Sequence, residues 1–99
     1  MQPITPSDDA ERQLLMRYLD RKQTDLANIE QAIAAGDYDE ARRIGHNLAG
    51  SGAAYGFVRV TVLGRQIEAA ARQRASADLL DTVAQLRQFL DGVVISEPG

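Results

Sequence analysis

The sequence predicts an all-α fold, an antiparallel up-down four-helix bundle. All three prolines lie near the two ends of the 99-residue chain, so no proline interrupts residues 7–97. Apolar residues recur at the spacings of amphipathic helices, and only a few residues separate the helical segments. Short connections favour antiparallel neighbours. We therefore expect one domain over residues 1–99, with residues 1–6 and 96–99 frayed.

The first helix should cover about residues 7–35, with Ser7 or Asp8 as its N-cap. Lys22 interrupts the apolar stripe of this helix. Two interpretations therefore stay open: one long helix, or two helices with a break near residues 20–23. The stripe consists of Leu15, Leu19, Leu26, Ile29 and Ile33.

Three shorter helices should follow. The second covers about residues 37–55, from a capping aspartate to a glycine that stops the helix. The third covers about residues 57–74, because its β-branched start continues without a break into a helical apolar pattern. The fourth starts at a cap formed by Ser76 or Asp78 and ends near Gly92.

Composition excludes several classes of function. The chain contains no cysteine, which excludes disulfides, thiolate metal sites and cysteine nucleophiles and fits a cytoplasmic location. Its 14 acidic residues outnumber its 11 basic ones, so we expect no nucleic acid partner. No apolar run approaches the ~18 residues of a membrane span, so we expect no membrane partner. Because the chain has a single histidine, His46, and no Glu-x-x-His pair, we expect no metal and no cofactor in it.

The second helix should place its histidine on the solvent face. At about 100° per residue, His46 lies opposite the buried stripe, and Gly50, one turn later, leaves room for a second backbone or a phosphoryl group. The helix contains three glycines, each costing about 1 kcal/mol relative to alanine, which marks a functional or closely packed site. The alternative is a merely solvated histidine on a face of small residues. The neighbours of the ring on this face are Asp39, Arg42, Arg43, Ala49, Gly50 and Ala53.

Residues 41–57 read ARRIGHNLAGSGAAYGF and resemble the signature of histidine-containing phosphotransfer (HPt) domains. In that signature, x-Leu-x-Gly-Ser follows the histidine, and a later glycine ends the helix. The resemblance extends over roughly residues 15–90 and includes an upstream Ala-Gly-Asp turn. The matching residues are His46, Leu48, Gly50, Ser51 and Gly56, with Leu63, Ile67 and Glu68 downstream.

The resemblance implies a phosphocarrier of two-component signalling with a four-helix bundle, no ATP site and no hydrolytic activity. His46 would accept a phosphoryl group from the aspartyl phosphate of a response-regulator receiver domain, or from a histidine kinase or hybrid kinase. It would then pass the group to another receiver aspartate. Gly50 would be the small residue flanking the ring, and a divalent metal would belong to the receiver. The expected protein is a cytoplasmic monomer, either free-standing or excised from a larger kinase.

Two features bear on how this site would work. Many family members carry a lysine three residues after the histidine, where this chain has Ala49. Arg42 or Arg43 could replace that cation, or both could be ordinary surface charges. Glu68 is the candidate that orients the ring, because a carboxylate on the flank of the third helix could accept one ring proton and leave the other nitrogen free. The alternative for Glu68 is a surface ion pair with Arg65 or Arg72.

Two other functions remain open. A helical adaptor would bind a receiver or kinase without being phosphorylated; Ala49 favours it, whereas His46 and Gly50 count against it. An enzyme with an all-carboxylate metal site would need paired carboxylates on buried stripes, which the sequence lacks. Receiver docking should use a small apolar patch beside the histidine. Candidates on the first helix, of which some must be core, are Leu14, Met16 and Tyr18.

Overall fold

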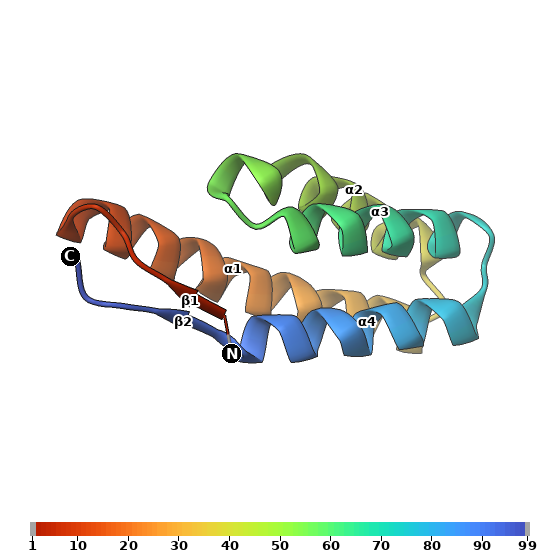
Figure 1. Cartoon of the computed structure of the whole chain (residues 1–99). Helices are drawn as coiled ribbons and strands as arrows, with labels where there is room; N and C mark the ends of the chain where they lie inside the picture. The colour runs from red at the N-terminus through yellow and green to blue at the C-terminus, as the bar shows by residue number, and fades with distance from the viewer. Residues whose placement is uncertain (1, 99) are drawn as a thin grey trace.

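The protein is mostly helical, as predicted. The computed structural model describes residues 2–98, which contain four α-helices, one 3₁₀ turn and a small two-stranded sheet (Figure 1). The bundle is elongated, with extents of 44 × 20 × 19 Å. The elements are β1 (Gln2–Ile4), α1 (Asp9–Ala34), α2 (Tyr38–Ser51), η1 (Ala53–Tyr55), α3 (Val58–Arg72), α4 (Ser76–Asp91) and β2 (Val93–Ile95).

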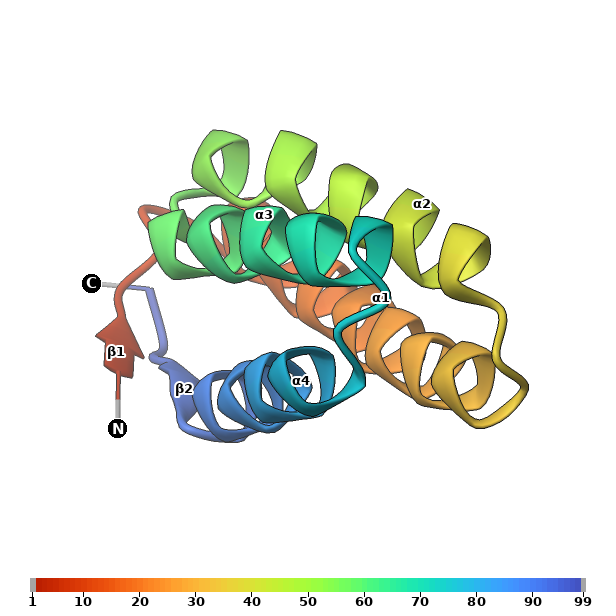
Figure 2. The ribbon, with the colours of Figure 1, turned by 90° about the vertical axis from the view of Figure 1, so that its right-hand side faces the viewer.

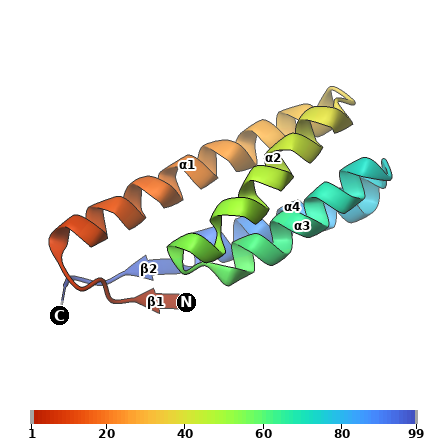
Figure 3. The same cartoon turned by 90° about the horizontal axis from the view of Figure 1, so that it is seen from above.

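The helices pack mainly in the cycle α1–α2–α3–α4–α1. Figure 2 shows α2 and α3 side by side with α1 and α4 below them, and Figure 3 shows α2 between α1 and α3. Apolar side chains from all four helices fill the interior, and their removal from water is the main source of stability. The largest fully buried ones are Tyr18, Leu26, Ile29, Leu48, Leu63, Ile67, Leu79 and Leu86.

The first helix is continuous, so the alternative of a break near residues 20–23 is wrong. Asp8 is its N-cap and accepts a hydrogen bond from the Glu11 amide at 2.7 Å. Lys22 sits in the apolar stripe with 9% of its surface exposed. Its ammonium group pairs with Asp25 at 2.7 Å and lies 5.0 Å from the centroid of the Tyr18 ring. These two contacts compensate the buried charge, so the helix need not break.

The second helix ends at Ser51, four residues before the predicted end. The chain then forms the 3₁₀ turn η1, and Gly56 ends that turn in the left-handed conformation with φ of 85°. Gly52, the C-cap residue of α2, lies against the third helix. A Cβ on Gly52 would be 2.6 Å from the Thr61 amide nitrogen.

The fourth helix has the predicted extent but not the predicted cap. Its N-cap residue is Ala75, whose side chain makes no capping hydrogen bond. The Ser76 hydroxyl instead forms a hydrogen bond with the hydroxyl of Tyr38, the first residue of α2. Neither Ser76 nor Asp78 therefore caps the helix as expected, because Ser76 already belongs to its first turn and contacts another helix.

The expectation that residues 1–6 are frayed is wrong for residues 2–4. Gln2–Ile4 pairs in parallel with Val93–Ile95, and the Ser96 amide donates to the Ile4 carbonyl at 2.8 Å. The β-branched residues near the C-terminus favour this pairing over fraying. Residues 96–98 form no regular element, and residues 1 and 99 lie outside the described residues. Among the helices of the described chain, none has the length and apolar character needed to cross a bilayer.

Two glycines allow α2 and α3 to approach each other closely. A Cβ on Gly64 would lie 2.5 Å from the Ala49 amide nitrogen, and a Cβ on Gly45 would lie 2.9 Å from the Glu68 amide nitrogen. Real Cβ atoms do not come this near to backbone atoms. The Thr61 hydroxyl adds a polar link across the same contact, because it donates to the Ala49 carbonyl at 3.0 Å.

Replacement of Gly64 and of Gly50 should have opposite effects on stability. Gly64→Ala inserts a methyl group against rigid backbone and should lower the free energy of unfolding by about 1–3 kcal/mol. The matched control is Gly50→Ala, because a Cβ there meets nothing within 4 Å. That change should raise the free energy of unfolding by up to about 1 kcal/mol through helix propensity. Urea denaturation of both variants measures the difference, and equal effects would contradict the proposed role of Gly64.

Candidate functional site

His46 lies in the middle of α2 on its solvent face, as the helical wheel predicts. Its side chain is 70% exposed. The opposite face of the same helix is anchored in the core by Ala41, Ile44 and Leu48, which are at most 4% exposed. A rigid helix therefore presents the imidazole to solvent at a fixed position.

Glu68 on α3 contacts the ring. Its Oε2 atom lies 3.1 Å from Nδ1 of His46, and only 19% of the Glu68 side chain is exposed. The same oxygen accepts a hydrogen bond from Nη2 of Arg72 at 3.4 Å. Of the two cations expected as alternative partners of Glu68, the structure therefore pairs it with Arg72, while the carboxylate also reaches the histidine.

This contact selects one tautomer of the neutral ring. A carboxylate only accepts hydrogen bonds, so Nδ1 of His46 carries the proton and donates it to Glu68. The other nitrogen, Nε2, then has its lone pair available. A neutral imidazole in this state can act as a nucleophile without a further base.

A pocket of about 210 Å³ lies beside the imidazole. It is lined by His46, Ala49 and Gly50 from α2 and by Arg65 and Glu68 from α3. Gly50 leaves this space open, because a Cβ there would meet no atom within 4 Å. The pocket thus combines a nucleophilic ring, a small-residue surface and one guanidinium group.

Arg65 is the pocket residue that sequence reasoning missed as a site residue. The sequence suggests Arg65 only as a surface partner of Glu68. Its spacing of three residues before Glu68 was the available signal, because residues at i and i+3 share a helix flank. Spacing places Arg65 at the site only in combination with the contact between Glu68 and His46.

The other predicted site residues lie outside this pocket. Arg43 forms an ion pair with Glu40 one turn earlier, and this hydrogen bond raises the pKa of the guanidinium above its usual value. Arg42 is half-buried on the same helix, and Ala53 begins the 3₁₀ turn. None of these three residues lines the space beside the ring.

Two of the three candidates for an apolar docking patch are exposed, and the third is buried. Leu14 and Met16 are 41% and 43% exposed, whereas Tyr18 is 1% exposed and belongs to the core. The Tyr18 hydroxyl forms a hydrogen bond of 2.9 Å with Ser51, so this motif serine ties α2 to α1. Burial raises the pKa of Tyr18 above its ordinary value.

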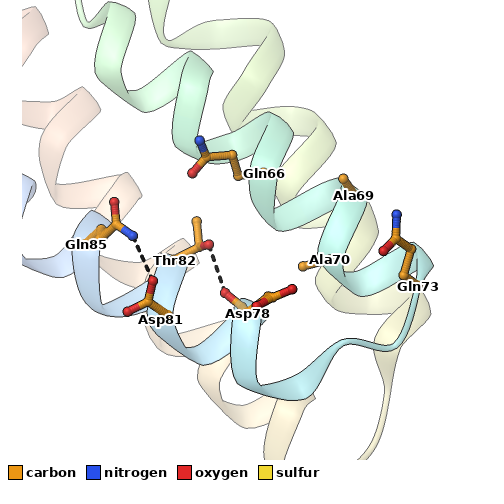
Figure 4. Close-up of a pocket in the computed structure, with 8 residues that line it drawn as sticks. All are labelled: Gln66, Ala69, Ala70, Gln73, Asp78, Asp81, Thr82 and Gln85. Atoms are coloured by element: carbon orange, nitrogen blue, oxygen red, sulfur yellow. Dashed lines mark hydrogen bonds between the residues drawn. The ribbon is translucent and has the colours of Figure 1, made fainter.

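A larger pocket, of about 330 Å³, lies between α3 and α4 (Figure 4). Its polar groups bond mainly within α4: Gln85 donates to Asp81 at 3.0 Å, and Thr82 donates to the Asp78 carbonyl at 2.9 Å. It contains neither a histidine nor a basic residue. Within residues 2–98, no group of three or more histidine, aspartate or glutamate side chains is arranged to hold a metal ion.

Comparison with known proteins gives one family match. The family model described as the Hpt domain matches residues 13–94, which include the histidine helix and most of the rest of the chain. Neither the search of curated proteins nor that of solved structures found a match.

Removal of the Glu68 carboxylate should change the tautomer of the ring. In the wild type we expect the Nδ1–H form, and in Glu68→Ala a mixture of both forms, because the acceptor at 3.1 Å is lost. The single histidine makes the ¹⁵N spectrum of the imidazole at alkaline pH unambiguous. The matched control is Gln66→Ala, an exposed position on the same helix. An unchanged tautomer ratio in Glu68→Ala would show that the contact does not orient the ring.

Proposed function

The chain belongs to the Hpt domain family, and on that premise we propose that His46 accepts a phosphoryl group and passes it on in a phosphorelay. Hpt domains are phosphocarriers of two-component signalling, and they work without a cofactor of their own. The observation that carries the assignment to His46 is its position: the sole histidine of the chain is 70% exposed and stands beside an open pocket. Phosphoryl transfer requires an accessible nucleophile in line with the leaving group.

In the proposed step, Nε2 of His46 attacks the phosphorus of an aspartyl phosphate on a receiver domain. The N–P bond forms as the P–O bond to the aspartate breaks, and the aspartate leaves with the bonding electron pair. Nδ1 keeps its proton, so the phosphorylated ring carries a positive charge, which the Glu68 carboxylate at 3.1 Å stabilises. The reverse step returns the group to a receiver aspartate. The receiver supplies the aspartate and a divalent metal.

The proposed partners are receiver domains and a histidine kinase or hybrid kinase. A receiver must bring its aspartate close to the ring, and the small residues Ala49 and Gly50 beside His46 leave room for that approach. We infer that the chain acts as a monomer in the cytoplasm. We also infer the antiparallel up-down arrangement predicted above, which the short turns and the run of colours along the chain in Figure 1 support.

Substitution of the histidine should abolish labelling. We expect the wild type to take radioactive phosphate from at least one phosphorylated receiver of its source organism, giving an acid-labile, alkali-stable adduct. The same adduct should form with phosphoramidate, a small donor that needs no partner protein. His46→Gln, which keeps a polar side chain of similar length, should give no adduct with either donor.

Two outcomes would overturn the assignment. If His46→Gln were labelled as strongly as the wild type, the phosphorylated residue would lie elsewhere. If the wild type bound a receiver but received no phosphoryl group from any receiver or from phosphoramidate, the chain would act as a helical adaptor instead.

A bulky residue at position 50 should separate docking from chemistry. Gly50→Leu fills the open space beside the ring and should slow transfer from a receiver at least about tenfold, whereas labelling by phosphoramidate should continue. Circular dichroism should show an intact bundle, because the new side chain points into open space. Normal receiver transfer in Gly50→Leu would disprove the steric role of the glycine.

A further inference from the structure

The pocket beside His46 requires a positive charge if the ring is phosphorylated. The phosphoryl group on Nε2 would bring up to two negative charges into a pocket that Glu68 also lines, and the Glu68 Oε2 atom lies 3.1 Å from the other ring nitrogen, Nδ1. The α2 side of the pocket contributes Ala49 and Gly50, neither of which has a charged side chain. The protonated ring separates the phosphoryl oxygens from Glu68, so a further cation is needed at the oxygens themselves to offset their charge.

The arginines near the site differ in whether a carboxylate of the chain already binds them. Arg43 is paired with Glu40, and Arg72 donates to Glu68 at 3.4 Å. Arg42 does not line the pocket. Arg65 lines it and is exposed, and within the described part of the chain it forms no ion pair or side-chain hydrogen bond.

We propose that the guanidinium group of Arg65 binds the phosphoryl oxygens on Nε2 of His46. This inference rests on the proposed function of His46. Guanidinium is always protonated and offers parallel N–H donors that match two phosphoryl oxygens at once. A residue engaged by no other anion can turn toward the phosphoryl group without breaking an existing ion pair.

The order of charges along α3 supports this division of roles. Arg65, Glu68 and Arg72 stand at i, i+3 and i+7, so all three share the flank of α3 that adjoins α2. Arg72 partly neutralises the carboxylate that holds the ring. Arg65, on the other side of the carboxylate along the helix, is left for the incoming group. The cation missing at Ala49 is thus replaced from the neighbouring helix rather than from α2.

Loading by phosphoramidate tests the proposal without a partner protein. Nε2 attacks the phosphorus, the P–N bond of the donor breaks, and ammonia leaves. Arg65→Ala should slow this loading about tenfold, the equivalent of one charge-assisted hydrogen bond. The matched control Arg42→Ala, which removes an equal charge one turn before His46, should load within about twofold of the wild type. Thermal melting of each variant verifies that the bundle is folded.

Restoring a positive charge distinguishes a loss of charge at Arg65 from a structural effect of its removal. Arg65→Lys should recover much of the rate, and so should the double change Arg65→Ala with Ala49→Lys, which supplies a cation from α2. Arg65→Ala loading within about twofold of the wild type, or a loss that neither change relieves, would overturn the role of Arg65. Either result would leave the function of His46 intact, provided that the wild type is labelled and His46→Gln is not. If the wild type takes no label, the proposed function itself fails.

Discussion

The close approach of α2 and α3 is the constraint on which the candidate site depends. Gly45 and Gly64, which have no side chain, lie where the two backbones meet. A Cβ at either position would lie within 3 Å of backbone atoms of the other helix. Gly45 directly precedes His46 and faces the amide of Glu68. The same contact that joins the helices therefore brings the carboxylate within hydrogen-bonding distance of the ring. A wider spacing of α2 and α3 would move the Glu68 carboxylate away from the His46 ring.

The site joins a rigid nucleophile to a small set of charges on a neighbouring helix. His46 is held by a helix whose opposite face is buried, so little motion of the backbone is needed or available. Glu68 is largely buried and shared between the ring and Arg72, which limits its own freedom. Arg65 is exposed and unengaged by other described residues, so it can follow a group that arrives and leaves. In the proposed transfer, the fixed side chains would orient the ring, and the exposed Arg65 would bind the phosphoryl group.

Periodicity was enough to predict the helices and the exposed face of His46, because both depend on local spacing along one helix. Contacts between distant segments were harder to predict. The sequence could not distinguish glycines that admit a neighbouring backbone, such as Gly45, from Gly50, which stays open, since all of them look like helix breakers. Lys22 looked like an interruption because its compensation involves Asp25 and the Tyr18 ring in three dimensions. The pairing of the two terminal strands likewise joins segments from opposite ends of the sequence, which local spacing does not predict.

The pairing of β1 with β2 has a mechanical consequence. Because the strands are parallel, Gln2 lies opposite the first residue of β2, whereas the C-terminal segment leaves the sheet beside Ile4. The two ends of the described chain therefore depart from opposite ends of the sheet (Figure 1). Tension between them would load the interstrand hydrogen bonds together, in shear, instead of opening them one after another. The hydrogen bonds of the small sheet would therefore bear a force applied to the two ends before it reached the helices.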